Sequence, residues 1–360
     1  MKSISIYRVN AVLFLIILTV TILYFGRTFL IPVAFSVLLG MLFLPVSRKL
    51  ESWGINRVWA TFICLLLILL FIAGIIGILG AQAANFSQDL PLIQTRSQEL
   101  LETLQTWIQQ KVNVSPEQQI GYLKRAVSNF SYSANAFITA ALSGTMGIIT
   151  GLVLTLLYFF FLMWKREKYK AFFLKLVEPE NRPALKHELN QITSVSSQYL
   201  IGRLISMIFL ATIYAVGFSI VGLKNGVLLA FVAVLPTIVP YIGAYIGGFF
   251  PLMMTLVTGT SGMILPVFLI LVIAQTIDNN IIEPMVEGQS LDLSPIITII
   301  ALVLGELIWG VAGMILFIPM FAILKIICEH IPALHPYGFL LANDVEEPRW
   351  VGKLKKIFKK

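Results

Sequence analysis

Long uninterrupted apolar runs recur along this chain, and they constrain its fold more than any other feature. Three come first, from about Val9 to Tyr24, Thr28 to Leu44 and Ala60 to Leu79, and a fourth spans Gly144 to Trp164. Each is close to the roughly 20 residues that a helix needs to cross a bilayer. Only 12% of the residues are charged, whereas a soluble domain has roughly a quarter. Because the runs are continuous rather than alternating, we predict an all-α, polytopic membrane helical bundle.

The basic residues gather at the ends of these runs. They include Lys2 and Arg8, Arg48 to Arg57, a dense group from Lys165 to Lys186, and five lysines after Gly352. Positive loops mark the cytoplasmic side of a membrane, so we predict that both termini are cytoplasmic. The net charge of +8 is thus explained by topology and the lipid bilayer, and we expect no nucleic-acid partner.

The order of polar and apolar stretches divides the chain into five predicted parts. They are a three-span bundle at 1–80, an extracytoplasmic amphipathic helical hairpin at 81–143, a fourth span with a basic cytoplasmic linker at 144–198, a core at 199–329 and a basic cytoplasmic tail at 330–360. Within the hairpin, Ser115 and Pro116 form a helix start signal. Its apolar stripe fits either an oligomerisation or gating element, with a homo-oligomer as the result, or a hairpin that covers its own stripe.

Two apolar segments of the core are interrupted by Pro and Gly. The first, 226–257, contains Pro236, Pro240, Gly243, Gly247 and Pro251. The second, 295–327, contains Gly305, Gly310, Gly313 and a closing Pro319. Either both are tilted crossings, which gives about eight spans with the loop 283–292 outside, or both are re-entrant hairpins, which moves that loop inside. A fifth span from about Leu204 to Val221 precedes them, and Leu265 to Ile277 lies between them.

Polar residues inside this apolar core are the candidate transport site, because an ionisable group in a membrane is costly and usually functional. They comprise Arg203, Gln275, Asp278, Asn279, Asn280, Glu283 and Glu306. Glu306, flanked by apolar residues on both sides, is either a proton-binding group or a protonated carboxyl bonded to a backbone carbonyl. Asp278 is interpreted as a helix-end or gate group that can meet substrate. Pro284 and Gly288 mark a further helix break.

Motifs for catalysis or tightly bound groups are missing from the sequence. There is no Walker A loop, no His-Glu-x-x-His zinc motif and no Gly-x-Ser-x-Gly elbow. The two cysteines, Cys64 and Cys328, lie in apolar runs and indicate packing rather than a disulfide or a metal site. We therefore expect no metal, no cofactor and no enzyme activity.

Three motifs resemble one family of membrane proteins. They are Leu235-Pro-Thr-Ile-Val-Pro-Tyr-Ile-Gly243, the stretch from Asp278 through Glu283-Pro284 to Gly288, and Gly310 to Pro319. Together with the order of the spans, they resemble the AI-2E family of multi-spanning bacterial membrane proteins. The resemblance implies a permease of a bacterial cytoplasmic membrane, in a family named for export of the quorum-sensing signal autoinducer-2. Some relatives are instead associated with sodium/proton exchange.

Three functional hypotheses remain at this point. The first is secondary-active or facilitated export of a small polar metabolite, such as an autoinducer-2-like signal. The second is a sodium or lithium/proton antiporter, with a monovalent cation and protons as partners. The third is a membrane scaffold that transports nothing and acts through the 81–143 hairpin.

Overall fold

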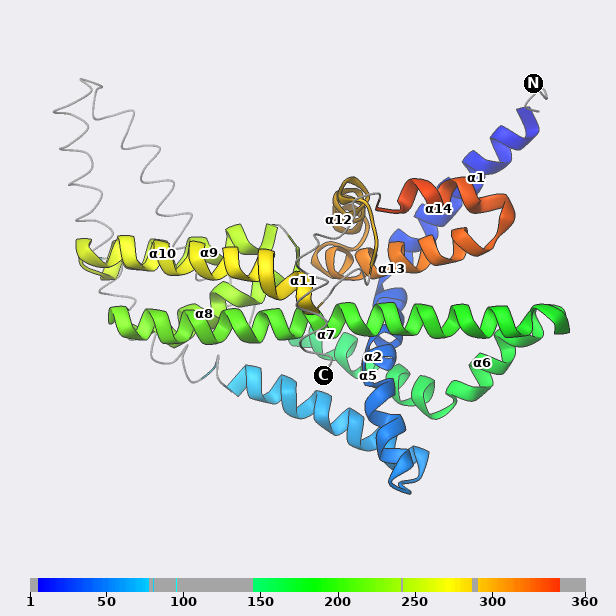
Figure 1. Ribbon diagram of the computed structural model, residues 1–360, viewed down its shortest axis with the longest axis horizontal. Coiled ribbons are helices and arrows are strands. Elements are labelled where there is room, and N and C mark those ends of the chain that lie inside the picture. The colour runs from blue at the N-terminus through cyan, green and yellow to red at the C-terminus, as the bar shows by residue number, and fades with distance from the viewer. Residues whose placement is uncertain are drawn as a thin grey trace. The chain divides into compact units, whose positions relative to one another are not determined.

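A computed structural model describes residues 6–77, 80, 95, 145–240, 242–286 and 291–343. Within them, every regular element is a helix except for one isolated β-bridge between Leu293 and Ala342 (Figure 1). The predicted all-α fold is confirmed. The predicted hairpin at 81–143 lies almost entirely outside the described residues, as do Gly288 and the lysine-rich end of the tail.

Five of the described helices are long and apolar enough to cross a bilayer. They are Arg27–Ser52, Arg57–Gly77, Pro179–Val221, Gly262–Val286 and Val311–His330. A sixth results if α5 (Thr145–Trp164) and α6 (Arg166–Lys175), which are bent by 68° at their junction, form one span. Shorter apolar helices accompany them, including the end of α1 (Ile6–Phe25). Membrane-spanning helices are therefore the main building blocks of this part of the chain.

The chain forms two compact units. The first unit contains residues 1–68, 150–204 and 283–360, and the second contains residues 69–149 and 205–282. The helix α7 (Arg182–Val221) contributes its first part to the first unit and its second part to the second. Hydropathy predicted a helix from about Leu204, whereas α7 begins at Arg182. The additional turns carry many polar residues, which a search for apolar runs passes over.

A helical hairpin dominates the end of the first unit. Its arms are α12 (Pro295–Trp309) and α13 (Val311–His330), joined at Gly310, whose φ is +62°. The backbones of Gly305 and Gly313 are in direct contact, so that a Cβ on either would overlap the other. In a straight helix these residues would be about 12 Å apart along the axis. The segment 295–327 therefore folds back on itself, and α12 and α13 lie side by side (Figure 1).

A second hairpin lies in the second unit. It consists of α8 (Gly226–Val234), the short 3₁₀ helix η2 (Leu235–Ile238) and α9 (Ile242–Thr258). Pro236 lies in η2, and Pro240 follows it at the turn. The backbone of Gly243 lies against that of Pro236, and Gly247 against Ala233. Such contacts between residues 7 and 14 positions apart need a chain reversal, so 226–257 is also a hairpin rather than one tilted helix.

The predicted breaks at Pro251 and Pro319 are wrong. Pro251 lies inside α9 and Pro319 inside α13, and both helices continue beyond them, α13 as far as His330. Each proline removes one backbone donor from the helix, which apolar membrane helices tolerate when neighbouring groups pack around the freed carbonyl. Both prolines are fully buried. The interruptions instead fall at 235–240 and at Gly310.

The contact of Gly247 with Ala233 leads to a testable prediction. A Cβ at Gly247 would overlap the carbonyl oxygen of Ala233, whereas a Cβ at the adjacent Gly248 would meet only Leu271 Cδ1, at 3.8 Å. We expect Gly247→Ala to destabilise the protein by about 1–3 kcal/mol, because backbone must move. Gly248→Ala should be neutral or stabilising by up to about 1 kcal/mol. Apparent melting temperatures in detergent measure the difference, and equal values for the two variants would contradict it.

Candidate functional site

Two facing stripes of side chains build the core of the second unit. On α7, Leu210, Tyr214 and Phe218 share one face with Ser206. On α10 (Ser261–Ile277), Val267, Leu271 and Ala274 share one face with Asp278. This three-to-four spacing is that of a helix packed on one side. Gly217 leaves room for Ile270, whose Cγ2 would be 2.9 Å from a Cβ at that position. The stripes thus bring the polar residue at each end, Ser206 and Asp278, together.

Asp278 is the most deeply buried of the predicted site residues. Its side chain is 1% exposed, and so is that of Ser206. The Ser206 hydroxyl lies 2.6 Å from both carboxylate oxygens and donates its proton to them. A hydrogen bond to a carboxylate is about twice as strong as a neutral one. This hydrogen bond stabilises the negative charge of Asp278 in buried surroundings, where an unpaired charge is unfavourable. The sequence predicted Asp278 but not Ser206.

A second polar chain runs beside Asp278 in the same unit. The Tyr214 hydroxyl lies 3.4 Å from Gln275 Oε1, and Gln275 Nε2 donates to Asn279 Oδ1 at 2.9 Å. Gln275 is half-buried and Asn279 is exposed. Asn280 is also exposed, and its amide donates to the Thr276 carbonyl of the preceding turn at 2.8 Å. The structure therefore joins Gln275 and Asn279 to Tyr214, which the sequence did not indicate.

The backbone at Asp278 departs from α-helical geometry. Residues Asp278–Ile282 form a π-helical turn, η3, directly after α10. Such turns are rare, and they occur frequently at functional sites. The four-residue helix α11 (Glu283–Val286) follows, and it contains Pro284 as its second residue. Because proline lacks an amide proton, Pro284 cannot donate a backbone hydrogen bond to a carbonyl of the preceding turn.

The first unit contains a second buried polar contact. Arg203 Nη1 donates to Glu283 Oε1 at 3.2 Å. Arg203 is only 8% exposed and Glu283 is half-buried. Paired ions are the usual form in which charges persist inside apolar surroundings. The structure thus brings together two residues that the sequence predicted separately.

Glu306 takes part in none of these contacts. It lies on α12 with an exposed side chain, beside the exposed Val303 and Leu307. Among the described residues, none lies within hydrogen-bonding or ion-pairing distance of its carboxylate. The buried residue on the same turn is Gly305, at the contact with α13.

Sequence reasoning also missed a buried lysine. Lys325 is 5% exposed within α13, and its ammonium group pairs with Asp292 and, at 3.2 Å, with Glu329. The backbone around Asp292 is held by hydrogen bonds of Asn343 N to Asp292 O and Ser294 N to Leu341 O. Through Asp292, Lys325 on α13 therefore contacts the segment that precedes α12, and the backbone of this segment is bonded to residues 341 and 343. A single Lys inside an apolar run was the signal available in the sequence.

The chemistry of these contacts is that of proton, ion or polar-solute binding. Carboxylate, hydroxyl and amide oxygens accept hydrogen bonds from a polar solute or bind a proton or small cation. Within the described part of the chain, no group of three or more His, Cys, Asp or Glu side chains is placed to hold a metal ion.

Comparison with known proteins gives a consistent result. The family model described as "AI-2E family transporter" matches residues 13–333. "Putative transport protein YueF" of Bacillus subtilis is 26% identical over 314 residues, which is 84% of this chain and 84% of that protein. "Putative transport protein YhhT" of Escherichia coli is 27% identical over 300 residues, covering 82% and 83%. "AI-2 transport protein TqsA" of Escherichia coli is 21% identical over 321 residues, covering 89% and 91%.

The matched region includes both helical hairpins, the Ser206–Asp278 contact and the Arg203–Glu283 pair. It also contains all five helices that are long enough to span a bilayer. Since the family model covers most of the sequence, the chain belongs to the AI-2E family of transporters and is a multi-pass membrane protein.

Proposed function

We propose that this protein moves a small polar metabolite across a bacterial cytoplasmic membrane, by secondary-active or facilitated transport, and that Asp278 contacts the solute or its coupling proton. The observation that carries the proposal is the buried carboxylate of Asp278. It lies at the start of a π-helical turn and accepts a hydrogen bond from Ser206 on α7. Ionisable groups within membrane helices are rare, and those present usually lie on substrate, ion or proton pathways.

The chemistry of the Ser206–Asp278 contact favours a solute with hydroxyl groups. Such a solute can donate to the Asp278 carboxylate in place of Ser206, and the exchange costs little because one hydroxyl donor replaces another. Nearby amides of Gln275 and Asn279 offer both donors and acceptors. A relative at 21% identity is named an AI-2 transport protein. We therefore propose export of an autoinducer-2-like signal as the first substrate to test.

The arrangement in the membrane is part of this proposal. The basic ends of the apolar runs support cytoplasmic N- and C-termini. Each interrupted segment folds back as a hairpin, so we propose that it returns to the side of the membrane from which it entered. With cytoplasmic termini, this arrangement puts the loop 283–292 on the cytoplasmic side. We further propose that the 81–143 region lies outside the cytoplasm and contributes to a homo-oligomer, and that Glu306 is a second proton-binding group.

Replacing Asp278 tests the proposed transport function. Asp278→Asn keeps the shape of the side chain but removes its charge, so the charge-assisted hydrogen bond with Ser206 is lost. Hydrogen bonds of charged groups contribute about 1.5–3 kcal/mol, so we expect transport rates to fall roughly 10- to 100-fold. The measurement is flux of labelled autoinducer-2 in proteoliposomes containing the full-length protein.

Thr276→Val is the matched control, since Thr276 is exposed and its hydroxyl donates to the Val272 carbonyl of its own helix, at 2.7 Å, rather than to another side chain. Its flux should equal that of the unmodified protein. Wild-type flux in Asp278→Asn would overturn the role of Asp278. A sodium- or lithium-driven pH change without solute flux would favour the antiporter, and neither activity would favour the scaffold.

A further inference from the structure

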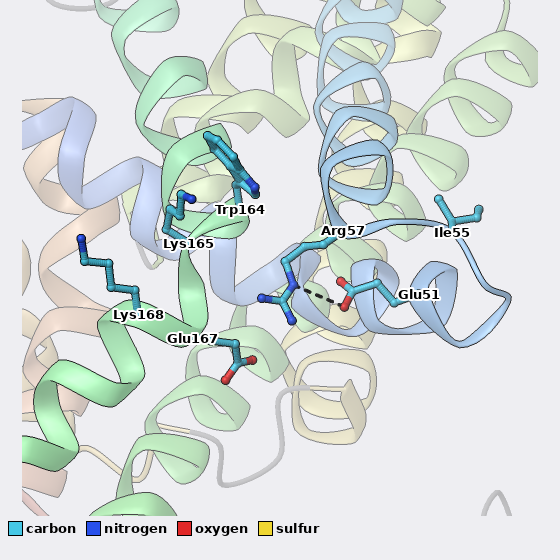
Figure 2. Close-up of a pocket in the computed structure, with 7 residues that line it drawn as sticks. All are labelled: Glu51, Ile55, Arg57, Trp164, Lys165, Glu167 and Lys168. Atoms are coloured by element: carbon cyan, nitrogen blue, oxygen red, sulfur yellow. Dashed lines mark ion pairs between the residues drawn. The ribbon is translucent and has the colours of Figure 1, made fainter.

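A basic pocket of about 490 Å³ lies in the first unit, apart from the contacts described above. It forms where α2 (Arg27–Ser52) ends, the helix Arg57–Gly77 begins and α5 turns into α6. Figure 2 shows the residues that line it: Glu51, Ile55, Arg57, Trp164, Lys165, Glu167 and Lys168.

The ion pairs in this region leave an excess of positive charge at the pocket. Arg166, beside the lining residues, donates to Glu51 at 2.6 Å and lies 3.6 Å from Glu167, so it occupies both carboxylates. Arg57 also faces Glu51 at 3.6 Å (Figure 2). Lys165 and Lys168 have no carboxylate within 4 Å among the described residues. With four cations against two acids, the pocket favours an anion.

The helices at this pocket have the features of a membrane interface. The 68° bend after Trp164 turns α6 away from the direction of α5. If α5 crosses the bilayer, α6 lies close to its surface. The helix α6 has three lysines and the exposed aromatics Tyr169, Phe172 and Phe173. Basic and aromatic residues on a short helix are typical of a segment at the headgroup level. Lys165 lies 3.9 Å over the ring of Trp164.

We propose that this pocket binds the headgroup of an anionic phospholipid. Lys165, Lys168 and Arg57 contact the phosphate, and Ile55 and Trp164 contact the adjoining glycerol and acyl carbons. Basic pockets between membrane helices bind anionic headgroups in this way. The exposed aromatics of α6 and the apolar lining residues Ile55 and Trp164 favour a lipid over a soluble phosphate, because they can contact acyl carbons that a soluble phosphate lacks. The lipid fastens α2, α5 and α6 together at one end of the first unit.

Native mass spectrometry of the full-length protein in detergent tests this site. Dioleoyl phosphatidylglycerol is added, with dioleoyl phosphatidylcholine and glycerol 3-phosphate as comparison ligands. The double variant Lys165→Gln/Lys168→Gln should bind phosphatidylglycerol roughly 30-fold more weakly, since each surface lysine contributes about 1 kcal/mol. Lys165→Arg/Lys168→Arg keeps the charges and should retain binding, which shows that the fold is intact.

The matched control is Lys170→Gln/Lys175→Gln, which removes the same charge from α6 outside the pocket lining. We expect it to bind phosphatidylglycerol as the unmodified protein does. Equal losses in both glutamine variants would show general charge attraction and overturn the site. Displacement of phosphatidylglycerol by equimolar glycerol 3-phosphate would identify a soluble phosphate site and overturn the lipid assignment, as would equal affinity for phosphatidylcholine.

Discussion

Removing both carboxylates that pair with Lys325 is expected to lower the free energy of unfolding by about 3 kcal/mol. Lys325 is only 5% exposed, and the variant Asp292→Asn/Glu329→Gln leaves its ammonium group without its two negative partners. Breaking a buried ion pair from one side costs about 3–5 kcal/mol. The lower end applies here because both carboxylates are partly exposed. Denaturant titration in detergent micelles measures the loss.

Adding Lys325→Met to this variant should restore most of the stability, because a buried charge is then replaced by an apolar side chain of similar length. Asparagine is a suitable replacement at position 292, since Asp292 has a φ of +45° and asparagine tolerates that conformation. If the triple variant is as unstable as the double one, the loss arises from the loop itself and not from the buried lysine.

Gly313→Leu is expected to disrupt the α12–α13 hairpin at a comparable cost, about 3 kcal/mol. Even a Cβ at Gly313 would meet the backbone of Gly305, which cannot rotate away as a side chain can. Inserting atoms into a packed interface usually costs about 1–3 kcal/mol, and more when backbone must move. We expect lower yields of folded protein and an apparent melting temperature that is lower by several degrees.

Gly151→Leu serves as the comparison for Gly313→Leu. Gly151 lies inside α5, where a Cβ would meet nothing within 4 Å, so the same added side chain has room. Its melting temperature should stay at or above that of the unmodified protein, since leucine favours helix over glycine by about 0.8 kcal/mol. A similar decrease in both variants would mean that the added bulk, and not the contact of two backbones, is responsible.

The long helices could be predicted because crossing a bilayer imposes a length and a composition on a continuous stretch of sequence. The direction that the chain takes after each interruption could not be predicted. Proline and glycine indicate where a helix is broken, but whether the chain then continues or reverses depends on contacts between residues far apart in sequence. Gly305 with Gly313 and Gly247 with Ala233 are such contacts.

In the candidate site too, some residues could be predicted from the sequence and others could not. Asp278 and Arg203 were predictable because a charged group in an apolar run is unusual whatever its surroundings. Ser206 was not, since a lone serine in a membrane helix most often bonds to its own backbone. Glu306 illustrates the converse. Its neighbours along the chain are apolar, yet its side chain is exposed, because the sequence does not indicate which face of α12 packs against α13.

The π-helical turn at Asp278–Ile282 limits what periodicity can reveal about this region. An α-helix advances about 100° per residue, and a turn closed by bonds from i to i+5 holds about one residue more than an α turn. Side chains before and after the turn are therefore out of phase by roughly 100° relative to a continuous α-helix. If the three-to-four spacing of the buried residues of α10 is extended through the turn, it consequently assigns Glu283 to the wrong face of the helix. The faces of the residues after the turn must be assigned separately from those before Asp278.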